Sequence, residues 1–490
     1  MANLTKEDIR SVIETIKGLY LEDMIPWICG YSGGKDSTAV VQLVWYALQE
    51  LPPEQRKKTV HVISTDTLVE SPVVAIWATE SLEKMRKAAK EQELPIIPHR
   101  LTPATTNTFW VNLIGRGYPY PRRDFRWCTD RMKISASNSF IKSILDAESE
   151  AIMVLGSRKA ESSVRKAILE DYEKRRYRAH LSPNGSFANS YVFTPIENWQ
   201  NDNVWQYLVQ VPNPWGHSNK DLLAMYSGAS ADGECPLVID ASTPSCGNSR
   251  FGCWVCTMVS EDKSMAAMIQ NDEEKAWMLP MLEFRDEIAG YGDWQTDRDR
   301  RDFRKRDGRL LWHNNRLVHG PYTKATREFF LRRLLEVEQL VHEIGPEEIR
   351  AVPLITMEEL KFIRQLWLDE FHEFDDALPR IYEEVTGKPY VDDVISKNKY
   401  FGAPEARLLE EVCAELYPDE QLLAEMQRAL LDTEAKAAAI SNKRNVILNF
   451  EKEIKKASYR NEEDAEQIAS SRALRISDLT EETSPDDLVD

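Results

Sequence analysis

Short apolar runs alternate with longer segments of helical periodicity over the first 225 residues. The runs have the length of buried strands, and each ends in a turn or a polar residue. They lie at 25–30, 59–65, 94–101 and 151–156. Between them, residues 36–50 and 73–92 place apolar side chains at helical spacing. Strands that alternate with helices predict an α/β fold with a mostly parallel sheet.

The pattern changes near residue 226. Residues 227–257 are rich in Gly, Ser, Pro and Cys and lack periodicity, which predicts an irregular segment ordered by a ligand. Leu and Ile return at helical spacing within a charged background and predict a helical C-terminal domain. The last thirty residues contain ten acidic and two basic residues, which is typical of a disordered tail. The predicted parts are an α/β domain at 1–225, an irregular Cys-rich segment at 226–260, a helical domain at 261–460 and a disordered acidic tail at 461–490.

Charge and hydropathy limit the class of protein. The 62 Lys and Arg against 80 Asp and Glu give a net charge of −18, which argues against a generally basic, nucleic-acid-binding surface. One basic run, TDRDRRDFRKRDGR, is interrupted by aspartates and is interpreted as a solvated, salt-bridged helix. No apolar run approaches the roughly 18 residues of a membrane span, and the N-terminus lacks the apolar block of a secretion signal. We therefore expect a soluble cytoplasmic protein without a membrane partner.

A phosphate-binding loop is predicted between the first strand and the following helix. Its residues are Ser32, Gly33, Gly34, Lys35, Asp36, Ser37 and Thr38. Glycines let the backbone approach an anion, and the N–H groups and dipole of the helix start attract it. Lys35 adds a positive charge, and Asp36 is placed to hold Mg²⁺ beside a leaving pyrophosphate. The loop is not a Walker A motif, because Cys29 stands at the first glycine position and Asp36 follows the lysine.

Four of the seven cysteines are close together in the sequence: Cys235, Cys246, Cys253 and Cys256. An odd total in a cytoplasmic chain favours metal or redox chemistry over a disulfide framework. The two-residue gap between Cys253 and Cys256 lets both thiolates bind one metal atom. Four thiolates suit zinc or an iron–sulfur cluster, and the spacing alone does not distinguish them.

The SGGKDST string resembles the PP-loop of the N-type ATP pyrophosphatases. That family includes adenylyl-sulfate and phosphoadenylyl-sulfate reductases and tRNA thiolation enzymes, which cleave ATP between the α and β phosphates or bind a related nucleotide. By this resemblance Asp66 contacts the nucleotide. LGSRKAESSVR at 155–165 resembles the family's second phosphate-side motif, and TPIENWQNDNVWQYL at 194–208 resembles the segment that closes the domain. The second motif contributes Gly156, Arg158, Glu161, Ser162 and Arg165.

DFRWCTDRMKI resembles the Cys-Cys-x-x-Arg-Lys segment with which reductase-like members bind a [4Fe–4S] cluster. Trp127 replaces one cysteine, and this leaves two functional interpretations of Cys128. Cys128 ligates the cluster in place of one downstream cysteine, or it carries sulfur as a thiolate or persulfide. We favour the second, in which Arg126, Arg131 and Lys133 lower the pKa of Cys128. An inert buried cysteine is the third interpretation.

Together these motifs resemble the DndC family, the phosphoadenylyl-sulfate-reductase-like sulfurtransferases of DNA phosphorothioation. The resemblance implies ATP pyrophosphatase activity with catalytic Lys35, Asp36 and Cys128, and a [4Fe–4S] cluster on the four downstream cysteines. It also implies a cysteine desulfurase as sulfur donor and other phosphorothioation proteins that bring DNA. An adenylyl-sulfate or phosphoadenylyl-sulfate reductase, a tRNA thiolation enzyme and a nucleotide-binding scaffold remain as alternatives.

Overall fold

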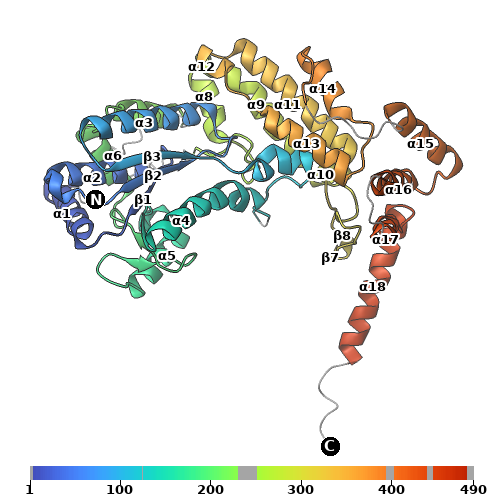
Figure 1. Ribbon diagram of the computed structural model, residues 1–490, viewed down its shortest axis with the longest axis horizontal. Helices are drawn as coiled ribbons and strands as arrows, with labels where there is room; N and C mark the ends of the chain where they lie inside the picture. Colours follow the sequence, from blue (N-terminus) through green and yellow to red (C-terminus); the bar gives the residue numbers. More distant parts are fainter. Residues whose placement is uncertain (1–3, 124, 230–250, 393–401, 439–444, 483–490) are drawn as a thin grey trace, which may run out of the picture. The chain divides into compact units, whose positions relative to one another are not determined.

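The computed structural model describes residues 4–123, 125–229, 251–392, 402–438 and 445–482, which divide into two compact units (Figure 1). Unit 1 comprises residues 1–107 and 121–285, and unit 2 comprises residues 108–120 and 286–490. The units do not follow the predicted boundaries at 225 and 260. The chain enters unit 2 at residue 108 and returns to unit 1 at residue 121, and it passes into unit 2 again at residue 286.

Unit 1 contains a six-stranded sheet with the order β3-β2-β1-β4-β6-β5. The strands are β1 (Trp27–Gly30), β2 (Val60–Thr65), β3 (Ile96–Leu101), β4 (Ala151–Val154), β5 (Ser182–Pro183) and β6 (Ser190–Phe193). All neighbours are parallel except β5 and β6. The predicted α/β fold with a mostly parallel sheet is confirmed, and β1 to β4 are the four apolar runs of the sequence.

Helices cover both faces of this sheet (Figure 1). Trp27 and Cys29 of β1 point into a core shared with α1 (Lys6–Glu22), α2 (Lys35–Glu50), α3 (Pro72–Glu91), α6 (Asn201–Gln210) and α7 (Asn219–Gly228). Ile28, between them, faces the opposite core with Ile141 of α4 (Ser135–Glu148), beside α5 (Ser163–Lys174). Successive side chains of a strand point to opposite faces, so an unbroken apolar run fills both cores.

The sheet reverses its strand order between β1 and β4. β1 pairs with β2 on one side and with β4 on the other. The helix that follows β1 packs on one face, and the helix that precedes β4 packs on the other. In open α/β sheets such a switch point leaves a crevice at the carboxyl ends of the two strands, where ligands bind.

Unit 2 is largely helical, as the sequence predicts. Its helices are α10 (Trp294–Asp299), α11 (Lys324–Ile344), α12 (Glu347–Arg350), α13 (Met357–Glu370), α14 (Ala377–Thr386), α15 (Ala403–Leu416), α16 (Leu423–Ala438), α17 (Val446–Lys456) and α18 (Glu462–Glu482). A short hairpin joins β7 (Trp312–His313) to β8 (Arg316–Leu317). The excursion at 108–120 packs on α13, where a Cβ on Gly115 would lie 2.9 Å from Cδ1 of Leu366.

Two predictions for unit 2 are corrected. The acidic segment from 461 is not a disordered tail over residues 462–482, because α18 buries Ala465 and Ala469 against Phe303, Leu317 and Tyr459. The basic run at 296–309 is helical only to residue 299, and beyond it the arginines form ion pairs from a loop. No helix in the described part of the chain is long and apolar enough to cross a membrane.

Candidate nucleotide and thiol site

The predicted phosphate loop makes a sharp turn between β1 and α2. Gly33 has φ +73°, and a Cβ there would lie 3.3 Å from both Ala78 and Trp77, so both the backbone angle and the space require glycine. The indole of Trp77 donates a hydrogen bond to the carbonyl of Gly33 at 3.1 Å. The hydroxyl of Ser37 donates to the carbonyl of Gly34 at 3.0 Å. These contacts hold the loop at the N-terminus of α2, where an anion is stabilised.

Asp36 is held between two cations. Its carboxylate lies 3.2 Å from Nζ of Lys35 and 2.7 Å from Nε of Arg158. The Arg158 side chain is only 4% exposed, and its backbone N–H donates to Glu161 at 2.8 Å. The second predicted motif therefore lies against the first. Lys35 also lies 5.5 Å from the ring centre of Tyr226 on α7.

Gly156 explains how the two motifs approach so closely. It follows β4, and a Cβ at this position would lie 3.0 Å from the carbonyl carbon and oxygen of Asp36. Only a residue without a side chain lets the β4 loop pass the first turn of α2. Ser162 then caps α5 by accepting a hydrogen bond from the N–H of Arg165 at 3.2 Å.

A cavity of about 770 Å³ opens beside the loop, within the usual range for small-molecule sites. Its lining includes all predicted loop residues from Ser32 to Ser37 together with the second motif. Thr38 is instead buried inside unit 1. Asp66 forms an ion pair with Arg100 at the end of β3, and its charge acts on Glu70, which lines the cavity.

The Cys253–Cys256 segment is attached to the end of the sheet. Cys253 forms an antiparallel bridge with Glu70, and the N–H of Trp254 donates to the carbonyl of Val69 at 3.0 Å. A turn follows, with the N–H of Cys256 donating to the carbonyl of Cys253 at 3.0 Å. The guanidinium of buried Arg285 donates to the carbonyl of Cys256 at 2.9 Å and fixes the end of this turn.

Cys128 lies in the same group of thiols. It precedes a π-helical segment, Thr129–Ile134, and interacts electrostatically with Cys256, as Cys253 does. π-helical turns are frequent at functional sites. Cys235 and Cys246 lie outside the described residues. Across the ranges that the structure describes, no three His, Cys, Asp or Glu side chains meet as a metal-binding group.

Lys133 and Glu70 connect the thiols to the nucleotide cavity. Both line the cavity, and they form an ion pair at 3.4 Å. Burial lowers the pKa of Lys133. The neighbouring Cys253, Glu70 and Cys128 together raise it by more, so the pKa is higher than that of an ordinary lysine. Burial raises the pKa of Glu70. Two charged side chains that interact with Cys253 thus lie on the wall of the cavity beside the loop.

The expected low pKa of Cys128 is not found in the metal-free chain. Burial raises its pKa, and burial also raises the pKa of Cys253 to about 12. Of the three expected cations, Lys133 interacts with Cys253 and Cys128. Nε of Arg126 donates to the carbonyl of Arg123, and Arg131 donates to Asn107. A nearby positive charge, such as a bound metal ion, lowers the pKa of a cysteine and would oppose this effect of burial.

The sequence analysis missed three residues of this site: Trp77, Glu70 and Tyr226. Trp77 and Glu70 belong to the segment after β2, and Tyr226 contacts the loop through the N–H of Lys35 at 3.4 Å. Trp77 and Tyr226 contact the loop from elements distant in sequence, and Glu70 pairs with Lys133 and Cys253. The only available signal was the position of Glu70 and Trp77 just after the carboxyl end of a predicted parallel strand.

Residues 26–215 match the model of the phosphoadenosine phosphosulfate reductase domain family. An uncharacterized protein of Methanocaldococcus jannaschii is 27% identical over 206 residues, which are 42% of this chain and 36% of the relative. The chain thus matches about a third of that protein's length.

Among solved structures, phosphoadenylyl-sulfate reductase from Candida auris in its phosphate complex is 13% identical, with a TM-score of 0.26. The similar region covers 44% of this chain and 91% of the reductase chain. U34-tRNA thiolase from Methanococcus maripaludis with its [4Fe–4S] cluster has 14% identity and a TM-score of 0.28, covering 59% and 78%. The match over 26–215 agrees with the sheet order and the loop, and this part of the chain is similar to the phosphoadenosine phosphosulfate reductase domain in sequence and has a mostly parallel α/β fold.

Proposed function

We propose that this chain is an ATP-dependent sulfurtransferase of DNA phosphorothioation. In this reaction cleavage of ATP between the α and β phosphates activates a DNA phosphate oxygen, which sulfur then replaces. One observation carries the proposal. Lys133 and Glu70 line the nucleotide cavity and also interact with the cysteine cluster, so nucleotide activation and thiol chemistry share one site.

The first step is adenylylation. A non-bridging phosphodiester oxygen attacks the α phosphorus of ATP, and the bond to the β-phosphate oxygen breaks to release pyrophosphate. Lys35 and the N–H groups at the start of α2 are placed to offset the charge of the leaving pyrophosphate. Asp36 is the candidate Mg²⁺ ligand, although in this chain Lys35 and Arg158 already hold its carboxylate.

The second step replaces AMP by sulfur. The terminal sulfur of a persulfide, supplied by a cysteine desulfurase, attacks the activated DNA phosphorus, and AMP leaves. A second thiol then attacks the sulfur–sulfur bond, which releases the phosphorothioate and leaves a disulfide. Oxygen leaves the DNA as part of AMP, and the two electrons come from the two thiols.

The cysteines fit a [4Fe–4S] cluster in the chemistry of their donors. Cys253 and Cys256 lie on one turn, Cys128 interacts electrostatically with Cys256, and Cys235 and Cys246 precede this turn in the sequence as further candidates. Such a cluster, when bound, supplies an iron site that can hold sulfide. The electrostatic interaction of Cys128 with Cys256 favours Cys128 as a ligand over the sulfur-carrier role expected from the sequence.

The decisive test is mass spectrometry of DNA for phosphorothioate dinucleotides. Cells with the intact chain and its partner proteins should contain them, and cells with Lys35→Ala should not. Lys87→Ala is the matched control, because Lys87 is 81% exposed on α3. Unmodified DNA with the intact chain, in cells that contain a desulfurase and the other phosphorothioation proteins, would rule the function out.

A reductase is the second candidate, favoured by the family match over residues 26–215. It would release sulfite from adenylyl-sulfate or phosphoadenylyl-sulfate with a thiol reductant. If the Lys35→Ala chain and the intact chain form sulfite at the same rate, the sulfite does not come from this site and the reductase candidate is not supported. Sulfite formed only by the intact chain, without phosphorothioate in DNA, would replace our proposal with this one.

A further inference from the structure

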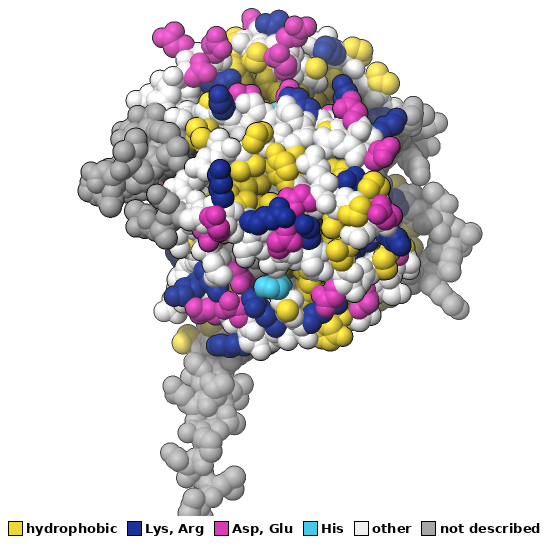
Figure 2. All heavy atoms as spheres, turned by 90° about the vertical axis from the view of Figure 1, so that its left-hand side faces the viewer, with side chains coloured by type: hydrophobic (Ala, Val, Ile, Leu, Met, Phe, Trp, Pro, Cys, Tyr) yellow, Lys and Arg dark blue, Asp and Glu magenta, His cyan; other side chains and the backbone are white. Residues whose placement is uncertain are grey.

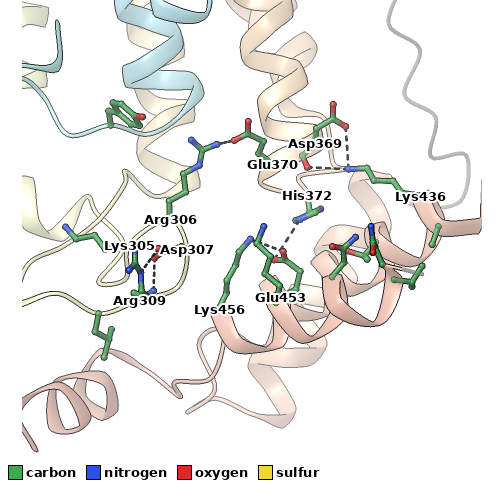
Figure 3. Close-up of a pocket in the computed structure, with 18 of the residues that line it drawn as sticks. Lys305, Arg306, Asp307, Arg309, Asp369, Glu370, His372, Lys436, Glu453 and Lys456 are labelled. Carbon is green, nitrogen blue, oxygen red and sulfur yellow. Dashed lines mark hydrogen bonds and ion pairs between the residues drawn. The ribbon is translucent and has the colours of Figure 1, made fainter. Parts of the chain in front are cut away.

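Unit 2 contains a cavity of about 1310 Å³ that has no part in the nucleotide site (Figure 3). It lies between the loop at 305–311, the end of α13, the end of α16 and one face of α17. Typical small-molecule pockets enclose roughly 300–1,000 Å³, so this space suits an extended ligand better than a compact one.

The lining is rich in cations although the chain as a whole is acidic. Six of its nineteen residues are Lys or Arg, against 62 of 490 in the whole chain. They are Lys305, Arg306, Arg309, Lys436, Lys452 and Lys456. Four lining residues are acidic, which gives the cavity an excess of positive charge within a chain of net charge −18. A local positive field of this kind attracts a polyanion.

Hydrogen-bond donors form a row along α17. Asn449, Lys452 and Lys456 follow Asn445 at intervals of four, three and four residues, which places all four on one helical face. Figure 3 shows Lys456 on this side of the cavity and Lys305, Arg306 and Arg309 on the loop across from it. Lysine, arginine and asparagine are the side chains that most often contact phosphate oxygens of nucleic acids.

Each of the four lining carboxylates is paired with a lining cation: Asp307 with Arg309, Glu370 with Arg306, Asp369 with Lys436, and Glu453 with Lys456. A donor can therefore reach a ligand most easily where its pair is exposed. The Arg309–Asp307 pair is 84% and 46% exposed, and exposed pairs of this kind contribute little stability, so Arg309 can turn to a phosphate. Glu453 is bound by Lys456 at 2.9 Å, and Asp432 accepts from His372 and Lys436 at 2.6 Å each. These buried carboxylates join α13, α16 and α17 and shape the wall.

We propose that this cavity binds the phosphodiester backbone of a DNA strand. The choice of DNA rests on the proposed function, whereas the preference for a phosphodiester chain rests on the donors and the size of the cavity. It gives the substrate a docking site on this chain in addition to any partner protein. The row on α17 contacts successive phosphates, and Arg309 contacts the strand from the opposite wall.

The test is binding of fluorescent single-stranded and duplex DNA to the full chain, followed by anisotropy over a range of salt concentrations. The double variant Arg309→Ala/Lys452→Ala removes one exposed cation from each wall. We expect its affinity to fall at least tenfold. The slope of log K against log[salt] should decrease by about 2, because each phosphate contact contributes about 0.9.

The control is Lys87→Ala/Lys166→Ala, which removes two exposed cations of unit 1 with the same change in net charge. Equal losses in both double variants would show a non-specific effect of charge and overturn the proposal. No DNA binding by the intact chain, or binding of inorganic phosphate alone, would overturn it as well. RNA of the same sequence that binds more tightly than DNA would overturn the choice of DNA.

The docking site and the proposed function can fail separately. Loss of DNA affinity in the Arg309→Ala/Lys452→Ala chain with unchanged release of pyrophosphate from ATP places the defect in docking. If DNA from cells contains no phosphorothioate, but the double variant still binds DNA more weakly than the intact chain, the proposed function is rejected and the docking site is retained.

Discussion

Gly156 is the residue at which the nucleotide site depends most directly on the absence of a side chain. In Gly156→Ala the added Cβ would lie 3.0 Å from the Asp36 carbonyl, so either the β4 loop or the start of α2 must move. We expect unfolding free energy to fall by about 1–3 kcal/mol, as for other overpacked sites, and the KM for ATP to rise. Urea unfolding and pyrophosphate release measure the two effects.

Gly185→Ala is the control for this change, since nothing lies within 4 Å of a Cβ at Gly185. Both substitutions lower the conformational entropy of the unfolded chain by a similar amount, so the difference in stability between the two variants reports the contact with Asp36. Equal KM values for the two variants would mean that the approach of the β4 loop to α2 does not shape the nucleotide site.

Cys128 allows a direct choice between its two interpretations. Because it interacts with Cys256, we expect Cys128→Ser, purified without oxygen, to lose most of its iron and labile sulfide. Cys413→Ser is the matched control, because Cys413 lies on α15 in unit 2, outside the unit that contains the site. Full iron in Cys128→Ser together with loss of sulfur transfer would favour the sulfur-carrier interpretation. Iron replaced by zinc in the intact chain would remove the cluster from the proposal.

At the scale of elements, the sequence predicts helices and strands where an apolar pattern repeats. It predicts little about elements that depend on contacts with residues far away in the sequence. β1 to β4 and their helices follow from apolar runs and periodicity. β6 has a mixed pattern and depends on pairing with β4. The sequence contains a local signal for the β7–β8 hairpin in the pair Asn314-Asn315. Asparagine tolerates positive φ, which both residues adopt and which a type I′ turn requires. The resemblance to a known family pointed to Cys128, but its interaction with Cys256 could be recognised only in the folded structure.

Two neighbouring strands also carry a pH-sensitive contact. Nδ1 of His61 on β2 lies 3.0 Å from Nε2 of His99 on β3, and such a hydrogen bond needs at least one neutral ring. Burial, with the charge of His99, lowers the pKa of His61 to about 4, and burial lowers the pKa of His99.

The unfolded chain therefore binds more protons than the folded chain between about pH 4 and pH 6.5, and unit 1 should gain stability as pH rises through this window. His61→Phe should reduce the slope by at most about 1.4 kcal/mol per pH unit, measured by urea unfolding. His313→Phe, at an exposed position, is the control. An unchanged slope in His61→Phe would show that this contact does not set the acid stability of unit 1.

At the scale of the whole molecule, charge and chain path were the hardest features to predict. The face drawn in Figure 2 mixes Lys and Arg with Asp and Glu. The basic run is largely held in internal pairs, such as Arg304 with Asp302 and Arg301 with Asp297. Composition gives only the sum of these charges. Three donors of the unit 2 cavity, Lys305, Arg306 and Arg309, belong to this basic run, but the others lie more than a hundred residues away, so no local pattern shows that they share one cavity.

The excursion at 108–120 predicts that unit 1 cannot be isolated by a simple truncation. Its Phe109, Trp110, Val111, Leu113 and Ile114 are fully buried within unit 2. Trp110 donates to the carbonyl of Leu354 at 2.7 Å, and Trp367 donates to the carbonyl of Ile114 at 3.1 Å. A chain ending after α9 (Leu279–Ile288) would expose this apolar segment. At about 1.5–3 kcal/mol for each side chain, the lost burial is comparable to the stability of a whole domain.

We therefore expect the chain that ends after α9 to aggregate during expression, as judged by size-exclusion chromatography. The same chain with 108–120 replaced by a flexible Gly/Ser segment of equal length should be monomeric and should keep ATP-dependent thermal stabilisation, because the PP-loop and its cavity lie wholly in unit 1. The comparison isolates the excursion, since the two chains differ nowhere else. If the simple truncation is soluble and binds ATP equally well, the excursion is not what ties the folding of unit 1 to that of unit 2.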